Sequence, residues 1–285
     1  MLRFIITIFL LIMCFVLGIS FLIFFNAIKP RRYISPLTPE KLNLSYRHIN
    51  LKTSDNLRLS AYYIPASVKT DKTIIVCHGY PADKNDILGA TFFLAEKFNL
   101  FLFDFRNLGH SDGTFCSFGY HERKDLLAAV NWITKNHPGP IGTYGFSVGG
   151  ATVLMSDCPD IKAIVADSSF ATAHNLIKRQ FSIFPGLLQK PFIWLMRIYM
   201  NTFLNIKISD ISPKNKISKK NIPILLIHGN SDRIIPVENA YMLYESSNKK
   251  TTNLWIVNNA DHGMCFHMEK EKYRKKITDF FESNL

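Results

Sequence analysis

Three residues of this chain have side chains that could together activate an alcohol as a nucleophile. A serine hydroxyl is a weak nucleophile at neutral pH, and it needs an imidazole to accept its proton and a carboxylate to orient that imidazole. The sequence offers Ser147 in Gly-Phe-Ser-Val-Gly, Asp232 in His-Gly-Asn-Ser-Asp and His262 in Asp-His-Gly. Their order, Ser then Asp then His, is one of the known permutations of such a triad. The chemistry requires that three distant segments meet in space.

The stretch at residues 141–150 predicts a strand that turns sharply into a helix with Ser147 at the corner. Such a corner brings the positions two before and two after the serine together, and Gly145 and Gly149 are small enough to fit there. The helix would begin at Val148, so backbone N–H groups without an intrahelical acceptor would face developing negative charge. For the pentapeptide alone, a Gly-Ser turn without chemical consequence is the alternative.

Strands and helices are expected to alternate along most of the chain. Strands are expected at 46–51, 57–64, 73–77, 100–103, 163–167, 223–227 and 253–257 as well as before Ser147, and helices at 87–98, 121–136, 237–244 and 268–281. This alternation predicts an α/β fold with a mostly parallel central sheet and helices on both faces. Ligands bind at the carboxyl ends of the strands in such sheets, and the Ser147 and Asp232 segments follow two of those ends.

Residues 168–220 interrupt the alternation. We expect them to form a helical cap insertion over the site, within a catalytic domain at 45–285. The insertion is rich in aromatic residues, and Pro191 is placed to open a helix. The alternative for any one of these aromatic side chains is simple packing against the main domain.

An uncharged run of 24 residues, Phe4–Ala27, lies near the N-terminus. At 1.5 Å per residue it can cross the roughly 30 Å hydrocarbon core of a bilayer. We therefore expect residues 1–32 to form a transmembrane signal-anchor with a basic flank, joined by a linker at 33–44. A cleaved signal peptide is the alternative, although its apolar region is usually about 7–15 residues. Three basic residues follow the run and Arg3 precedes it, which favours a cytoplasmic catalytic domain.

The net charge of +12 is concentrated in the N-terminal segment and in residues 171–220. This placement favours an anionic membrane surface over nucleic acid as a partner, with a solvated basic face as the alternative. The five cysteines form no C-x-x-C pair and have no metal-type spacing, so they indicate neither a disulfide framework nor a metal site. We expect no metal and no organic cofactor, and the oligomeric state stays open.

Five motifs make the chain resemble the α/β-hydrolase superfamily, in particular its small membrane-anchored serine hydrolases, over about residues 45–285. They are HGY at 78–80, DFRNLGHSDG at 104–113, GFSVGG at 145–150, HGNSD at 228–232 and DHG at 261–263. The HGGG form found in some lipases and esterases is missing from the sequence.

The resemblance implies a role for each candidate residue. Ser147 would be the nucleophile, His262 the general base and then acid, and Asp232 the orienting carboxylate, while the backbone N–H groups of Tyr80 and Val148 would form the oxyanion hole. The expected activity is hydrolysis of a carboxylic ester or thioester of a small-molecule or lipid acyl substrate through an acyl-enzyme. A serine peptidase or amidase on the same triad is one alternative, and a non-catalytic scaffold of this fold is the other.

Overall fold

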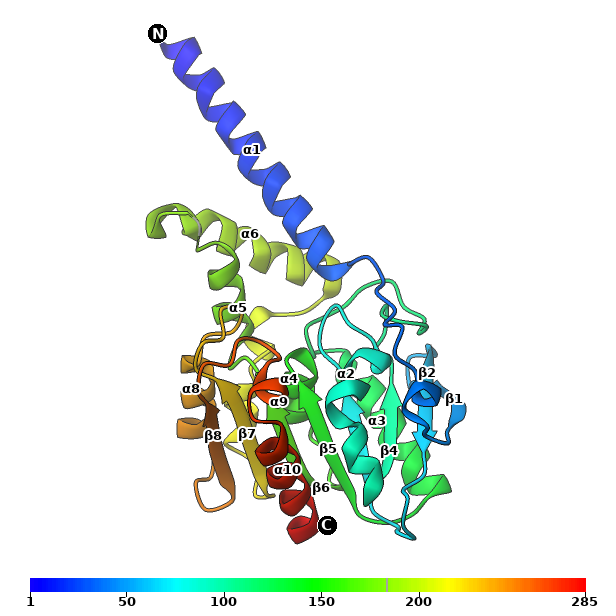
Figure 1. The fold of residues 1–285 in the computed structure, drawn as a ribbon. Coiled ribbons are helices and arrows are strands. Elements are labelled where there is room, and N and C mark those ends of the chain that lie inside the picture. Colours follow the sequence, from blue (N-terminus) through cyan, green and yellow to red (C-terminus); the bar gives the residue numbers. More distant parts are fainter. Residues whose placement is uncertain (183) are drawn as a thin grey trace.

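The computed structural model describes residues 1–182 and 184–285. Its central feature is one eight-stranded sheet with the order β1-β2-β4-β3-β5-β6-β7-β8 (Figure 1). The strands are β1 (Arg47–Lys52), β2 (Arg58–Ile64), β3 (Thr73–Cys77), β4 (Asn99–Phe103), β5 (Ile141–Phe146), β6 (Ile161–Asp167), β7 (Ile224–Gly229) and β8 (Thr252–Val257). β2 is antiparallel to β1 and to β4, and all the other pairs are parallel. The predicted mostly parallel sheet is confirmed.

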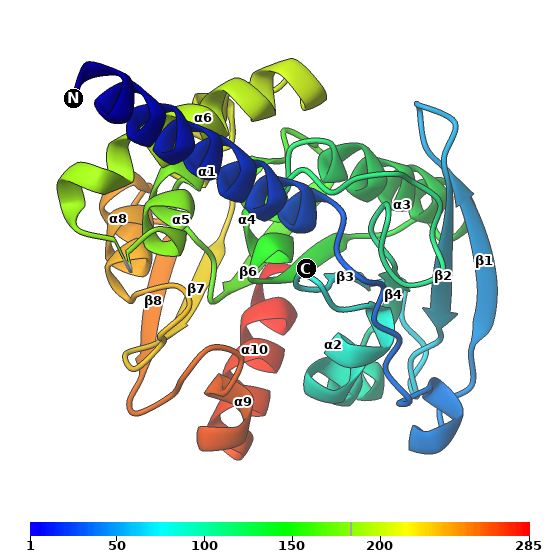
Figure 2. The ribbon, with the colours of Figure 1, turned by 90° about the horizontal axis from the view of Figure 1, so that it is seen from above.

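Helices cover both faces of this sheet (Figure 2). The described α-helices are α1 (Leu2–Ile28), α2 (Lys84–Thr91), α3 (Glu122–Asn136), α4 (Val148–Met155), α5 (Ala173–Gln180), α6 (Gly186–Leu204), α7 (Pro213–Ile217), α8 (Glu238–Ser246), α9 (Cys265–Met268) and α10 (Lys270–Asn284). Short 3₁₀ segments lie at η1 (Pro39–Leu42), η2 (Phe92–Glu96) and η3 (Ile208–Asp210). Helices α2 and α10 lie on one face, and α3, α4 and α8 lie on the other.

The central strands are apolar throughout because both of their faces are buried. In β3, Ile75 and Cys77 pack in the cluster that contains α3, α4 and α8. Their neighbours Ile74 and Val76 point to the opposite side, into the cluster that contains α2 and α10. Successive side chains of a strand alternate between faces, so a strand between two helical layers needs apolar residues at every position.

The largest differences from the expected helices are at three places. The helix expected at 87–98 begins at Lys84, because Asp83 caps it by accepting a hydrogen bond of 3.0 Å from the Asp86 N–H, and it ends in the 3₁₀ segment η2. The final helix is divided into α9 and α10. Pro191 lies inside α6 rather than at its start, and Pro185 precedes the first turn.

The insertion between β6 and β7 contains α5, α6 and α7, and α6 packs along the N-terminal helix α1 (Figures 1 and 2). Only one stripe of α1 is buried, at Ser20, Phe24 and Ile28, a spacing of four residues that places them on one side of the helix. Phe24 and Ile28 join an apolar cluster with α6 and α4. The last turns of α1 are therefore part of the folded body, while its first turns extend away from it.

Candidate active site

The corner between β5 and α4 holds Ser147 in a strained backbone conformation. Its φ is +53° and its ψ is −113°, a left-handed combination that non-glycine residues rarely adopt. A Cβ on Gly145 would overlap the Gly149 carbonyl, and a Cβ on Gly149 would overlap the Cys77 carbonyl. The two glycines are therefore required by close approach of the backbone, as the sequence predicted. The Ser147 N–H donates to the Asp167 carbonyl oxygen at 2.8 Å, which ties the corner to β6.

The structure brings the three predicted side chains together. The His262 Nε2 atom lies 3.2 Å from Ser147 Oγ, and His262 Nδ1 lies 2.7 Å from Asp232 Oδ2. The Asp232 side chain is fully buried, whereas 13% of the His262 side chain is exposed. The other carboxylate oxygen, Asp232 Oδ1, accepts the N–H groups of Ile234 at 2.9 Å and Ile235 at 2.7 Å. Asp232 is thus held in one orientation with its second oxygen aimed at the imidazole.

The loops after β7 and β8 meet through backbone contacts. Gly229 ends β7 so close to Ala260 that a Cβ would overlap the Ala260 carbonyl. The same carbonyl accepts the Ser231 N–H at 3.1 Å. These contacts fix the loop of Asp232 against the loop of His262, which explains why residues far apart in sequence can pair.

Asp261, beside His262 in the sequence, is engaged elsewhere. Its carboxylate accepts the Arg233 backbone N–H at 3.0 Å and the Arg233 Nε–H at 2.7 Å, and it accepts the His262 backbone N–H at 2.8 Å. The Arg233 backbone N–H and guanidinium hold the pKa of the Asp261 carboxyl well below its usual range. Asp261 therefore clamps the two loops and does not contact the imidazole. No sequence pattern predicts this clamp, because it depends on the register between two separate loops.

The two amides expected to form an oxyanion hole lie at the start of α4 and after β3. Val148 is the first residue of α4, where an N–H has no intrahelical acceptor. For the Tyr80 N–H, no acceptor is found within residues 1–182 and 184–285. A Cβ on Gly79 would come within 3.5 Å of the Ser147 Cβ, so the two segments are adjacent. The Tyr80 side chain points elsewhere, and its hydroxyl donates to the Ala27 carbonyl of α1 at 2.7 Å.

His78 ends β3 and is a buried structural histidine. Its Nδ1–H donates to the Gly79 carbonyl at 2.6 Å, so its Nε2 accepts the Phe105 N–H, at 2.9 Å. Both nitrogens of the neutral ring are satisfied, and protonation would break the contact with Phe105. Burial lowers the pKa of the His78 imidazole from its ordinary value.

This lowered pKa makes stability depend on pH. The unfolded chain takes up a proton at His78 more readily than the folded chain as the pH falls through about 6.5, so the contribution of His78 to stability falls as the pH drops below that value. Between about pH 7.5 and pH 5.5, we expect the free energy of unfolding to fall further in the wild type than in His78→Gln. Chemical denaturation of the two detergent-solubilised proteins at both pH values measures this difference. An equal fall in the free energy of unfolding in the two proteins would contradict the prediction.

Buried ion pairs order the loop that follows β4. Lys84 Nζ lies 2.6 Å from Asp104 Oδ2 with both side chains fully buried, and Arg106 pairs at 2.6 Å with the buried Asp125. Asp104 and Arg106, both in the DFRNLGHSDG motif at 104–113, therefore order this loop. The sequence analysis missed their partners Lys84 and Asp125. Each lies in a helix, and its polar side chain is indistinguishable in the sequence from those on a solvent-exposed helix face.

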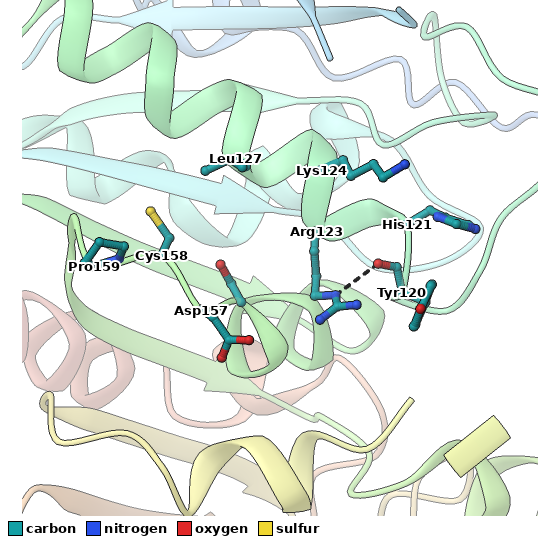
Figure 3. Close-up of a pocket in the computed structure, with 9 residues that line it drawn as sticks. Tyr120, His121, Arg123, Lys124, Leu127, Asp157, Cys158 and Pro159 are labelled. Atoms are coloured by element: carbon teal, nitrogen blue, oxygen red, sulfur yellow. Dashed lines mark hydrogen bonds between the residues drawn. The ribbon is translucent and has the colours of Figure 1, made fainter. Parts of the chain in front are cut away.

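Two cavities of similar size are present among the described residues. The first, of about 520 Å³, lies between the start of α3 and the loop after α4, and its polar lining includes His121, Arg123 and Asp157 (Figure 3). The Arg123 Nε–H donates there to the Tyr120 carbonyl at 3.0 Å. This cavity contains no member of the predicted site. The second, of about 550 Å³, is mainly apolar and includes Tyr80 in its lining.

Comparisons with known proteins identify the superfamily of the chain. The family model of X-Pro dipeptidyl-peptidase (S15 family) matches residues 43–190, and that of the prolyl oligopeptidase family matches residues 117–285. Each match spans more than half of the chain. The chain belongs to the α/β-hydrolase superfamily of serine hydrolases.

Several known proteins match along most of the chain. The esterase Pf2001 of Pyrococcus furiosus has a TM-score of 0.74 and 27% identity, covering 90% of this chain and 99% of that chain. The Bacillus subtilis protein YqkD is 28% identical over 232 residues, which is 79% of this chain and 75% of the relative. The acylaminoacyl peptidase of Pyrococcus horikoshii shares the fold, with a TM-score of 0.63 and 20% identity over 85% of this chain and 42% of that chain.

Proposed function

We propose that this serine hydrolase cleaves a carboxylic ester or thioester of an apolar acyl substrate through a covalent acyl-enzyme. The observation that carries the proposal is the continuous contact from Ser147 Oγ to His262 Nε2 at 3.2 Å and from His262 Nδ1 to Asp232 Oδ2 at 2.7 Å. Those distances match the hydrogen-bond reach of about 2.6–3.2 Å that a nucleophile and its base require. We also propose the domain boundaries that the sequence predicts, with a linker at residues 33–44 and a cap at residues 168–220.

In the first half of the reaction, His262 Nε2 accepts the Ser147 hydroxyl proton while Oγ bonds to the substrate carbonyl carbon. The carbonyl oxygen becomes an oxyanion, which the N–H groups of Tyr80 and Val148 stabilise. Asp232 accepts from Nδ1–H and stabilises the imidazolium. The imidazolium then gives its proton to the alcohol or thiol, which leaves with the bonding electron pair, and the acyl group stays on Ser147.

In the second half, water takes the place of the alcohol. His262 removes a proton from the water, the hydroxide oxygen bonds to the acyl carbon, and the same two N–H groups hold the oxyanion. Collapse expels Ser147 Oγ, which recovers a proton from His262. The carboxylic acid leaves, and the enzyme returns to its initial state without an added cofactor.

A serine peptidase or amidase is the second candidate, and the matches to two peptidase families favour it. The similarity to the Pyrococcus furiosus esterase supports ester hydrolysis, because it covers 99% of the esterase chain. The similarity to the acylaminoacyl peptidase covers only 42% of the peptidase chain. The mainly apolar cavity beside Tyr80 also supports an acyl substrate.

A fluorophosphonate probe tests the function and its substrate class together. We expect the probe to label Ser147 in the purified full chain and acyl esters or thioesters to compete with it more strongly than aminoacyl amides. Direct turnover of the same compounds provides the matching rate measurement. Hydrolysis of amides without hydrolysis of esters would favour the peptidase, and a folded protein that neither labels nor turns over any of them would contradict both candidates.

We also propose that α1 anchors the enzyme in a membrane with its catalytic domain in the cytoplasm. α1 is long and apolar enough to cross a bilayer, a property that a signal sequence would share. Retention as an anchor is supported by Phe24 and Ile28, which are only 3% and 8% exposed and would leave an apolar gap in the domain if α1 were removed. Protease added outside intact cells should leave the catalytic domain uncut, and cleavage before lysis would place it on the other side.

A further inference from the structure

The apolar cavity of about 550 Å³ has the N-terminal helix as one of its walls. Ile23, Phe24 and Ala27 of α1 line it together with Met196 and Met200 of α6, and further lining residues come from α5. Its volume lies within the range of about 300–1,000 Å³ that small-molecule sites occupy. The cavity therefore exists only while the end of α1 is packed on the insertion.

The cavity is also lined by residues that neighbour the proposed catalytic groups. Tyr80 lines it, and the Tyr80 N–H is one of the two proposed oxyanion donors. Ile234 lines it as well, and the Ile234 N–H donates to Asp232 at 2.9 Å. Val148, the residue after the nucleophile, packs in the same apolar cluster as Phe24. An acyl chain in the cavity would thus have its carbonyl end close to the proposed site.

The end of α1 is bonded to the loops around the site. The Tyr80 hydroxyl donates to the Ala27 carbonyl at 2.7 Å, and the Cys116 N–H donates to the Ile28 carbonyl at 2.7 Å. These carbonyls belong to the last turn of the helix, where backbone oxygens lack intrahelical partners. The domain supplies the missing donors, so the helix end has a defined position against the cavity.

The length of α1 places the cavity at the membrane boundary. Its 27 residues span about 40 Å at 1.5 Å per residue, whereas the hydrocarbon core is roughly 30 Å thick. About two turns therefore remain outside the core, which matches the packed turns at residues 23–28. Beside them, α6 exposes Trp194 (60%) and Phe203 (56%), as well as two basic residues, Lys190 and Arg197. Aromatic and basic side chains together are typical of a helix at a lipid interface.

We propose that α1 is a wall of the substrate pocket and that the substrate is a membrane-resident lipid ester whose single acyl chain enters from the bilayer between α1 and α6. This inference rests on the proposed function, because it assigns the substrate class to the same serine site. The anchor then has two tasks: it holds the enzyme at the bilayer, and its last turns shape the pocket that receives the chain.

Filling the pocket from the α1 side tests the proposal. The full chain in lipid nanodiscs is assayed with p-nitrophenyl dodecanoate and p-nitrophenyl acetate, and the ratio of the two kcat/KM values is compared between variants. Ala27→Phe and Ile23→Trp each add bulk to the wall, and we expect the dodecanoate-to-acetate ratio to fall by about tenfold or more in both. Leu22→Trp is the matched control, because Leu22 is 59% exposed on the outer side of α1. Its ratio should stay within about twofold of wild type.

Labelling of Ser147 by fluorophosphonate separates the two possible failures. One contrary outcome is that all variants are labelled while the dodecanoate-to-acetate ratio is the same in Ala27→Phe, Ile23→Trp and the control. In that case α1 is not a wall of the substrate pocket, but the hydrolase function stands. If the folded wild type neither labels nor turns over either ester, the proposed function itself fails. A fall in the ratio in Leu22→Trp as large as in Ala27→Phe would also overturn the inference, since the effect would then not come from the cavity.

Discussion

Replacing Ser147 with alanine should lower kcat for the best ester substrate by at least about 10⁴-fold and abolish fluorophosphonate labelling. Without Oγ there is no atom to form the acyl-enzyme, and His262 Nε2, which lies 3.2 Å from that oxygen, has no proton to accept. Residual turnover would come from the oxyanion donors and from binding alone. Steady-state rates of the two purified proteins, with circular dichroism to confirm folding, measure the effect.

Ser231→Ala is a suitable control for this substitution. Ser231 is an exposed serine next to Asp232, and among the described residues its hydroxyl forms a hydrogen bond only to Asn230 Oδ1, at 3.3 Å. We expect its kcat to stay within about threefold of wild type, since surface substitutions away from special features have small effects. Turnover of Ser147→Ala at the wild-type rate, or labelling that persists on another serine, would remove Ser147 from the mechanism.

The sheet and the candidate triad were predictable because both depend on local patterns. A buried parallel strand such as Thr73–Cys77 needs apolar residues on both faces, and the structure has β3 at those residues. Gly145 and Gly149 mark the nucleophile corner because any Cβ there would overlap backbone atoms. Once the strands are parallel, their carboxyl ends share one edge, so the segments of Ser147, Asp232 and His262 must approach each other.

What could not be predicted depends on contacts between distant segments. The clamp between Arg233 and Asp261 needs two loops in register, and the buried pair of Lys84 and Asp104 joins a helix to a separate strand end. A lysine in a helix is normally solvent-exposed, and the sequence does not reveal that Lys84 is fully buried. The expectation for Pro191 was wrong because a proline at the start of a helix is common, whereas here Pro191 lies inside α6.

The position of α1 was the largest gap in the sequence-based interpretation. Hydropathy treats an apolar run as uniform. It therefore predicts a membrane span but does not distinguish the turns that face lipid from the turns that face protein. The separation follows the buried stripe at Ser20, Phe24 and Ile28, which is set by the surface of α6. A single apolar sequence thus serves both as a candidate membrane span and as part of the protein core.

The identity of the orienting carboxylate has the second large expected effect. Asp232 Oδ1 accepts two backbone N–H groups, from Ile234 and Ile235, so in Asp232→Asn the amide oxygen must stay on that side and the NH₂ group must face His262. The imidazole then has to accept at Nδ1, which moves its proton to Nε2. A protonated Nε2 in the neutral ring cannot accept the proton of Ser147, so kcat should fall by about 10⁴-fold with little change in fold.

Asp261→Asn distinguishes this effect from a general loss of acidic charge near the imidazole. Asp261 accepts from Arg233 and from the His262 backbone N–H but does not contact the ring, so its replacement loosens the clamp without changing the tautomer. We expect kcat to fall by less than about tenfold, with the loss coming from a less constrained His262 loop. If the large loss appeared in Asp261→Asn and the small one in Asp232→Asn, the carboxylate assignment would have to be reversed, because only the group that fixes the Nδ1 proton can control whether Nε2 is free to act as a base.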